Sequence, residues 1–338
     1  MTKTPFWKKI KKEKERKKLL VFTVFFLSFF SLLFLTRILK NFARTLTTPL
    51  EPKECFASKT SISSANRIYF LLDFGNLLLI SFDKEKKEIE GILLPGNFYL
   101  QKEGEVYRLG AFFELGKMKS NCGGRFLKRE IEGLLSLPVD RYLKFKETET
   151  PSLEDFEEIF LKIKSYSFPF LFFKNFFLKK KIETDLSFWE ILQVWWQVRK
   201  VRRDKVWFFV PKNISFSYLL PDRTKIEVVD RQKILGKLQG RFEDEKMKKE
   251  RVEVAVLNTT GKRGKAKEAG KMIENLGGNL VHIGNYPLNL KENQIWIREA
   301  RYRNMYTTRR LGEIFQAQVF LKKNLEERGE VLLLLGEK

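Results

Sequence analysis

Histidine and cysteine are nearly absent from this chain: its 338 residues include one histidine, His282, and two cysteines, Cys55 and Cys122. A structural zinc site built of His and Cys needs a full tetrahedral set of such ligands, which three scattered residues cannot supply. The same shortage excludes Ser-His-Asp and Cys-His mechanisms unless His282 serves, and its place in the apolar run LVHIG predicts a strand residue without a chemical role. The composition therefore predicts no metal centre of this kind and no resident cofactor.

The two cysteines also lack a diagnostic setting. Cys55 follows EPKE rather than the L-x-x-C pattern of a lipoprotein. If the chain is exported, both thiols lie where a disulfide is permitted. One pair with no spacing signature leaves open whether Cys55 and Cys122 are joined.

Charge is missing from one stretch of 18 residues, Leu19 to Thr36 (LLVFTVFFLSFFSLLFLT). As a helix rising about 1.5 Å per residue it covers roughly 27 Å, which is close to the thickness of a bilayer's hydrocarbon core. Residues 1–18 carry nine Lys or Arg and two Glu, a net 9 − 2 = +7. The positive-inside rule then predicts a cytoplasmic tail (1–18), a transmembrane signal anchor (19–39) and an extracytoplasmic remainder at the cell membrane. A cleaved signal peptide is the alternative, but NFARTLTTPLEP offers no small-residue cleavage site.

Acidic residues are too few to balance the basic ones, since 65 Lys and Arg stand against 42 Asp and Glu. After the +7 of the tail, 23 − 7 = +16 remains for the rest of the chain. Outside the cytoplasm the candidate anionic partners are the lipid bilayer, lipid-linked glycopolymers, wall polymers such as those on peptidoglycan, and extracellular DNA. The predicted topology argues against a role in transcription and against intracellular nucleic acid as a partner, and a basic surface that is merely solvated stays an alternative.

Turn-forming and charged stretches divide the remainder. We expect a linker over 40–65, an α/β domain over 66–230, a charged linker over 231–250 and a compact two-layer α/β domain over 251–338. Within the first domain, residues 187–200 (SFWEILQVWWQVRK) predict an amphipathic helix. The aromatic segment 167–181 predicts either a helix that rests on the bilayer or a buried helix with a lysine-rich end.

The last ninety residues carry a strand, a glycine loop and a helix in the run VEVAVLNTTGKRGKAKEAGKMIENL. GKRGK has the wrong spacing for a P-loop and G-x-G-x-x-G is absent, so nucleotide binding is not indicated. The run instead resembles the C-terminal domain of LytR proteins, in the LytR-CpsA-Psr family of bacterial envelopes. The matching motif residues are Asn258, Gly261 and Gly264, and the family's closing apolar strand corresponds to VLLLLG.

The first domain is similar to the catalytic domain of the same family. NLLLISFDKEKKEIEGILLPGNFYL follows the pattern of a strand ending in I-D-P, a charged turn and a strand ending in S-I-P-R-D. GAFFELG, LPVDRYLKF and TDLSFWE stand where the family has N-A-A-Y-x-x-G, L-G-I-P-I-D-Y-Y and T-N-L-S. The resemblance implies a degenerate domain of that α/β fold behind a membrane anchor.

Departures from the family pattern fall on its charged residues. The Arg and Asp of the family's P-R-D motif correspond to Gly96 and Asn97 in this chain. Where the family has an earlier Arg-x-Asp motif, the only nearby charged residue of that kind is Asp73. The family's Arg-rich helix has no counterpart between 145 and 186. In that family, the resemblance implies, these groups grip a lipid pyrophosphate and its Mg²⁺. Gly and Asn cannot neutralise phosphate charge, so the motifs imply the fold rather than the reaction.

Three function classes remain open. The first is a non-catalytic envelope protein that binds envelope polymers, lipid-linked precursors or partner proteins. The second is a phosphotransferase that attaches lipid-linked glycopolymers to peptidoglycan with Mg²⁺, through Asp73, Arg108 and Arg125. The third is an anion-binding surface. VRKVRRDK predicts either a binding site or a charged helix end, and its arginines are Arg199, Arg202 and Arg203.

Overall fold

The computed structural model describes residues 64–102, 104–145, 182–323 and 327–337, together with Arg37, Lys40, Thr48 and Cys55. The chain divides into two compact units, Met1–Thr48 with Ser187–Trp189, and Pro49–Leu186 with Glu190–Lys338. All three sheets belong to the second unit. The apolar run and the segment 167–181 lie outside the described residues, and among the helices that are described none is long and apolar enough to cross a membrane.

The first sheet has six strands in the order β7-β6-β1-β2-β3-β8. β1, β2 and β3 form an antiparallel meander, and β6 and β8 add to it in parallel beside β1 and β3. The strands are β1 (Arg67–Asp73), β2 (Leu77–Asp83), β3 (Glu88–Leu94), β6 (Arg141–Phe145), β7 (Ile182–Thr184) and β8 (Val206–Phe209).

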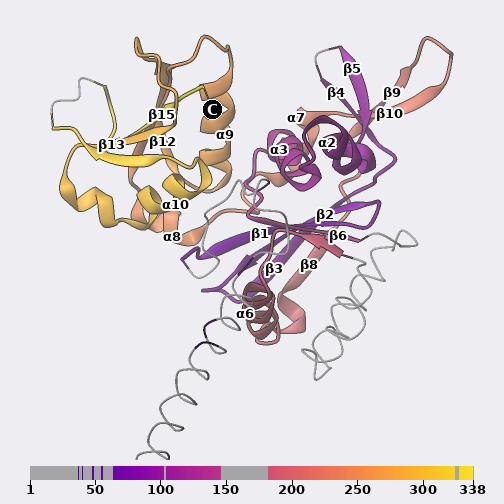
Figure 1. The fold of residues 1–338 in the computed structure, drawn as a ribbon, viewed down its shortest axis with the longest axis horizontal. Helices are drawn as coiled ribbons and strands as arrows, with labels where there is room; N and C mark the ends of the chain where they lie inside the picture. The colour runs from indigo at the N-terminus through magenta and orange to yellow at the C-terminus, as the bar shows by residue number, and fades with distance from the viewer. Residues whose placement is uncertain are drawn as a thin grey trace, which may run out of the picture. The chain divides into compact units, whose positions relative to one another are not determined.

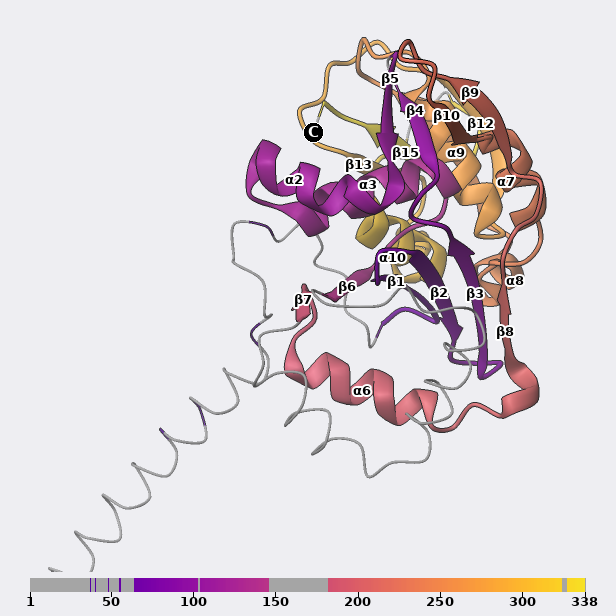
Figure 2. The ribbon, with the colours of Figure 1, turned by 90° about the vertical axis from the view of Figure 1, so that its right-hand side faces the viewer.

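Alternation along β1 assigns the two faces of this sheet. Tyr69 and Leu71 belong to the main core beneath the helices α2 (Phe112–Ser120) and α3 (Gly123–Leu135). Ile68 and Phe70 pack on the other face with residues of α6 (Phe188–Val198). Figure 2 shows α2 and α3 on one side of the sheet and α6 on the other. Because side chains alternate along a strand, Asp73 lies on the α2–α3 face.

The second sheet is smaller, with the order β5-β4-β10-β9. Its strands are β4 (Tyr99–Lys102), β5 (Glu105–Arg108), β9 (Ser215–Leu219) and β10 (Lys225–Val229). The 3₁₀ helix η2 (Leu109–Ala111) connects β5 to α2. Figure 1 shows β4 and β5 beside α2 and α3, so this sheet extends the layer that covers the Asp73 face.

The C-terminal part has a five-stranded sheet in the order β12-β11-β15-β13-β14. Its elements are β11 (Glu253–Asn258), α9 (Lys265–Asn275), β12 (Asn279–Asn285), β13 (Gln294–Ile297), η5 (Ala300–Asn304), α10 (Tyr306–Ile314), β14 (Gln318–Leu321) and β15 (Val331–Leu335). The buried strand VLLLL lies between β11 and β13. The mixed α/β class predicted from the sequence is confirmed.

The segment 231–250, which we expected to be a linker, consists of α7 (Arg231–Leu238) and α8 (Glu245–Glu250). Asp230 and Asp244 cap the two helices through their side chains. Ile234, Leu238 and Met247 are buried in the main core. The segment is thus built into the fold, and the independent folding of 66–230 and 251–338 stays a prediction.

A buried ion pair connects the first sheet to the C-terminal part. Arg310 of α10 places Nη1 and Nη2 3.0 and 2.9 Å from the two carboxylate oxygens of Asp140, just before β6. Tyr69 donates its backbone N–H to Asp140 Oδ2 at 2.9 Å, and its hydroxyl to the carbonyl oxygen of Phe242 at 2.7 Å. Tyr306 donates its hydroxyl to Asp244. This network lies within one compact unit, since both parts belong to it.

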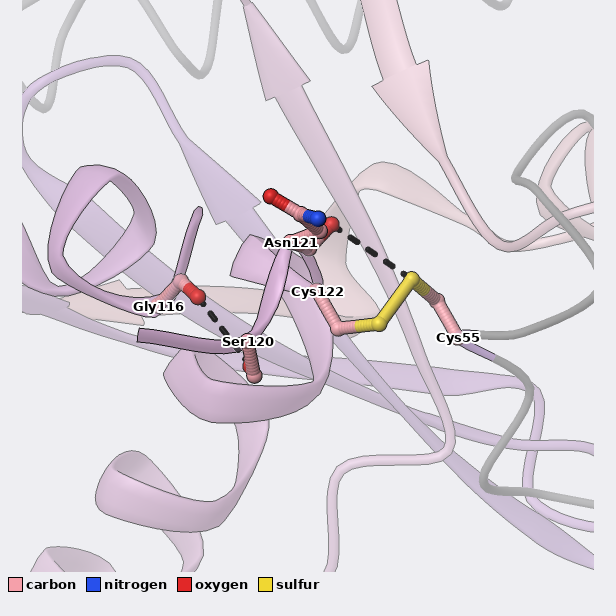
Figure 3. Close-up of a disulfide and its surroundings, with 5 residues drawn as sticks. All are labelled: Cys55, Gly116, Ser120, Asn121 and Cys122. Carbon is pink, nitrogen blue, oxygen red and sulfur yellow. Dashed lines mark hydrogen bonds between the residues drawn. A yellow bond between two sulfur atoms is a disulfide. The ribbon is translucent and has the colours of Figure 1, made fainter. Parts of the chain in front are cut away.

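Cys55 and Cys122 form a disulfide, which resolves the question that the sequence left open. Cys122 is the N-cap residue of α3, so the bond ties the chain before β1 to the start of that helix. Figure 3 shows the Cys55 sulfur near the carbonyl oxygen of Asn121, at 3.6 Å, and the Ser120 hydroxyl donating to Gly116 O. The covalent loop spans 67 residues and includes β1 to β5 and α2.

Candidate functional site

Asp73 ends β1 and is paired with a lysine that the motif comparison did not single out. β1 and β6 run parallel with Asp73 beside Lys144, and the Lys144 ammonium lies 2.9 Å from Asp73 Oδ2. Asp73 Oδ1 accepts the backbone N–H of Gly75 at 2.9 Å. Burial raises the pKa of Asp73, and the charge of Lys144 opposes that rise. The carboxylate is therefore committed to an internal ion pair.

Three glycines, Gly75, Gly96 and Gly110, bring three backbone segments into contact beside Asp73. A Cβ atom at Gly96 would lie 1.6 Å from the carbonyl oxygen of Gly75, and one at Gly110 would lie 2.9 Å from the same oxygen. Gly96 donates its N–H to Asn76 Oδ1 at 2.9 Å and accepts the N–H of Gly110 at 3.0 Å. Gly75 itself has a φ of 87°. We call this contact the glycine junction; position 96 within it has no room for a side chain.

Arg108 lies at the edge of the glycine junction and helps to hold it. Its Nε donates to the carbonyl oxygen of Gly96 at 3.1 Å, and the side chain is otherwise exposed at the end of β5. Asn97, at the family's aspartate position, is also exposed. The structure thus brings Asp73 and Arg108 to opposite sides of one backbone contact. No hydrogen bond or ion pair joins the two side chains, within the described residues.

Aromatic rings and lysines of α2 line the surroundings of the Asp73–Lys144 pair. The ammonium groups of Lys117 and Lys144 lie 4.9 and 5.8 Å from the centroid of the Phe113 ring. Lys117 is also 2.8 Å from the carboxylate of Glu183 on β7. Lys117 and Lys144 therefore each already have a carboxylate and the Phe113 ring as partners.

The other predicted arginines lie elsewhere. Arg125 is exposed in the first turn of α3. Arg199 follows α6, with its guanidinium 4.9 Å from the Trp195 ring, and Arg202 pairs with Asp204 at 3.1 Å. Arg203 begins the 3₁₀ helix η4 (Arg203–Lys205). Since α6 covers the face of the sheet opposite to Asp73, Arg199, Arg202 and Arg203 do not converge on Asp73.

The residues present do not fit the magnesium ion that the family resemblance implies. Oxygen ligands suit Mg²⁺, but Asp73 is bound to Lys144 and the neighbouring family position is the amide of Asn97. Among the residues that the structure describes, no group of three or more His, Cys, Asp or Glu could hold a metal ion. We therefore derive no reaction step through a metal at this site.

The C-terminal motif residues shape a loop. Asn258 ends β11, accepts the N–H of Thr260 at 3.1 Å and donates its amide to the carbonyl oxygen of Lys262 at 3.0 Å. Gly264 is the N-cap of α9 with a φ of 86°, a left-handed conformation that favours glycine. Gly261 has open space around it. His282 lies in strand β12, as the sequence predicts.

Sequence reasoning missed Lys144, Asp140 and Arg310. A weak signal existed for Arg310: in the helix it is three residues after the buried Thr307 and next to the buried Leu311, so its side chain belongs to the inward stripe. The sequence gives no sign of the partner of Arg310. Its partner, Asp140, is 170 residues away in the chain.

Comparison with known proteins gives similarities to solved structures only. No protein-family model matches the chain, and no curated protein sequence matches it. A transcriptional regulator from Enterococcus faecalis is 12% identical, with a TM-score of 0.41 over 65% of this chain and 92% of that chain. TagT bound to LIIa-WTA is 12% identical, with a TM-score of 0.40 over 56% of this chain and 95% of that chain. B. subtilis TagU is 12% identical, with a TM-score of 0.37 over 53% and 98%. YwtF (TagT) with bound octaprenyl pyrophosphate lipid, a LytR-CPS2A-psr family protein, is 12% identical, with a TM-score of 0.35 over 56% of this chain and 95% of that chain.

Proposed function

We propose that this chain is a membrane-anchored cell-envelope protein of the LytR-CpsA-Psr type that binds its ligand without transferring it. The anchor is the apolar run over 19–39, with residues 1–18 in the cytoplasm and the folded bulk outside. The ligand is a lipid-linked glycopolymer precursor or an envelope polymer. The family resemblance implies binding of such ligands, and the positive charge of the chain favours it.

The observation that carries the non-catalytic part is the glycine junction. In a phosphotransferase, a guanidinium must reach the phosphate oxygens whose charge grows in the transition state. The position that would carry it is Gly96, where even a Cβ atom would lie 1.6 Å from a backbone oxygen. The backbone itself therefore fills the space from which that arginine would start.

Charge supports the same conclusion. Asp73, the carboxylate that could polarise an attacking group or hold Mg²⁺, is bound to Lys144. Lys117 is bound to Glu183, and Arg108 holds the Gly96 carbonyl oxygen. Bidentate recognition of a pyrophosphate needs several unengaged donors that converge. Near Asp73 the donors that the structure describes serve the fold, which is compatible with weak binding of an anion and not with turnover.

The test is an assay of the purified full-length protein, in detergent with Mg²⁺, for hydrolysis of polyprenyl pyrophosphate and for transfer of a lipid-linked glycopolymer to peptidoglycan. We expect no turnover, and binding of the lipid pyrophosphate that weakens as salt is added. Arg125→Gln and Arg108→Gln should weaken that binding, whereas Arg263→Gln, on the exposed loop before α9, is the matched charge control.

Turnover above the no-enzyme rate that Asp73→Asn or Arg108→Gln abolishes would overturn this proposal. It would establish instead the phosphotransferase alternative, with Asp73, Arg108 and Arg125 as relocated active-site residues. Absence of both turnover and lipid binding would refute the lipid-linked precursor as the ligand.

A further inference from the structure

The C-terminal end of α6 presents an exposed aromatic side chain surrounded by cations. Trp196 is 57% exposed on α6, and the Lys200 ammonium lies 5.6 Å from the centroid of its ring. Arg199 lies over the neighbouring Trp195, which is buried. Arg203 follows in η4 and is exposed. We call Trp196, Arg199, Lys200 and Arg203 the α6 basic surface.

This surface has an unbalanced positive charge. Residues 199–205 contain five Lys or Arg and one Asp, a net 5 − 1 = +4. Asp204 pairs with Arg202, and Lys205 pairs with Glu88 at 2.8 Å. No carboxylate within the described ranges forms an ion pair with Arg199, Lys200 or Arg203. Three exposed cations therefore have no counter-charge among the residues that the structure describes.

More positive charge lies beside it. Lys205 Nζ donates to the carbonyl oxygen of Lys86 at 3.3 Å, which brings the turn between β2 and β3 next to η4. Lys87 in that turn is exposed. The cations thus come from two segments that are more than a hundred residues apart in sequence, and they extend the surface beyond a single helix end.

The combination of tryptophan and cations selects one kind of partner. A solvated basic helix end has no need for an exposed indole, whose apolar body is unfavourable in water. At a bilayer surface, the indole sits at the headgroup level, and each nearby Lys or Arg gains about 1 kcal/mol from anionic lipids. An anionic wall polymer would satisfy the cations but would offer no apolar layer for Trp196.

We propose that the α6 basic surface binds the headgroup region of an anionic phospholipid bilayer, with Trp196 inserted at the interface. This contact is separate from the predicted anchor and independent of whether the Asp73 site is catalytic. It would set which side of the domain faces the membrane.

The experiment uses the full-length protein in lipid nanodiscs. One set is made of phosphatidylcholine and the other of phosphatidylcholine with phosphatidylglycerol. In both sets the lipid acyl chains are brominated, so that they quench the fluorescence of a tryptophan at the bilayer. We expect additional quenching in the anionic discs, and Trp196→Phe should remove it. Trp207→Phe is the matched control, because Trp207 is 65% exposed but faces away from α6. Its neighbour Val206 packs against the same buried cluster as Val198 of α6. Since side chains alternate along a strand, Trp207 lies on the opposite face of β8.

The triple variant Arg199→Gln, Lys200→Gln, Arg203→Gln should reduce the surface-bound population on the order of a hundredfold, since three contributions of about 1 kcal/mol are lost. All three positions are exposed, so thermal unfolding of the triple variant should match that of the unaltered protein. Equal quenching in neutral and anionic discs, or quenching that Trp196→Phe leaves unchanged, would overturn the proposal. Binding of soluble poly(glycerol phosphate) without bromolipid quenching would overturn it in favour of a wall polymer.

Discussion

Replacement of Asp140 by asparagine should destabilise the protein more than any substitution of an exposed charge. The Asp140 and Arg310 side chains are 3% and 1% exposed, and two hydrogen bonds of 3.0 and 2.9 Å connect them. Asp140→Asn keeps the size of the side chain but leaves the buried guanidinium of Arg310 with one more distant carboxylate, that of Glu313, at 3.7 Å. Breaking one partner of a buried ion pair costs about 3–5 kcal/mol. We expect a loss of that size in the free energy of unfolding.

The assay is urea unfolding, followed by circular dichroism and by tryptophan fluorescence, of residues 40–338, the chain without its predicted anchor. Arg310→Met should cost a similar amount, and the double variant should cost less than the sum of the singles by roughly 1–3 kcal/mol, because the second change removes the orphaned charge. Asp204→Asn, which breaks the exposed pair with Arg202, is the control and should cost less than about 1 kcal/mol.

The pH dependence gives an independent check on the same pair. Burial alone would raise the pKa of Asp140, but Arg310 and the backbone N–H of Tyr69 hold it below its ordinary value of 3.8. A carboxyl group whose pKa is lowered by folding contributes its full stabilisation at pH values above its ordinary pKa. This contribution is lost as the pH falls through the lowered pKa of the folded state. The unaltered protein should therefore lose stability below pH 3.8 more steeply than Asp140→Asn. A cost under about 1 kcal/mol for Asp140→Asn, or strict additivity in the double variant, would refute the reasoning.

Three further outcomes follow from other parts of the fold. Gly96→Ala should lower the free energy of unfolding by at least about 1–3 kcal/mol through overpacking, whereas Gly133→Ala, in open space on α3, should raise it by up to about 1 kcal/mol in the same urea titration. Cys55→Ser with Cys122→Ser should cost about 4 kcal/mol, from the 67-residue loop; an unchanged midpoint in oxidising buffer would contradict this. Burial raises the pKa of Glu132 to about 7 from 4.5, so stability should fall as pH rises between those values and Glu132→Gln should flatten that slope.

Elements with strong local signals were predictable from the sequence. Residues 123–135 have apolar side chains at helical spacing and form α3 with those bounds. The helix over 265–275 ends before Gly277. Gly277 has a φ of 80°, the left-handed conformation that favours glycine just after a helix. VLLLL is the central buried strand of the C-terminal sheet. A strand that is covered on both faces is apolar throughout, without alternating polar residues, and this run has that pattern.

What the sequence could not supply are relations between distant segments. The second sheet depends on β9, which is exposed along most of its length and so gives no sign of a partner, and on β10, which pairs with β4 from more than a hundred residues away. Asp140 and Arg310 look like ordinary charged residues until the fold removes water from both. The same is true of Lys144, which becomes a partner of Asp73 only through the parallel register of β1 and β6.

The glycine junction shows why the candidate site differs from a site that has merely lost its charges. If only the guanidinium were missing, Gly96→Arg would restore a cation in the right place. Here the Gly75 carbonyl oxygen fills the space where that side chain would begin, and Gly110 and Arg108 both hold the Gly96 carbonyl oxygen in its position. An arginine at 96 must therefore displace the turn after β1, and with it the N–H that Asp73 accepts from Gly75. Regaining the cation at position 96 would therefore disturb the carboxylate of Asp73.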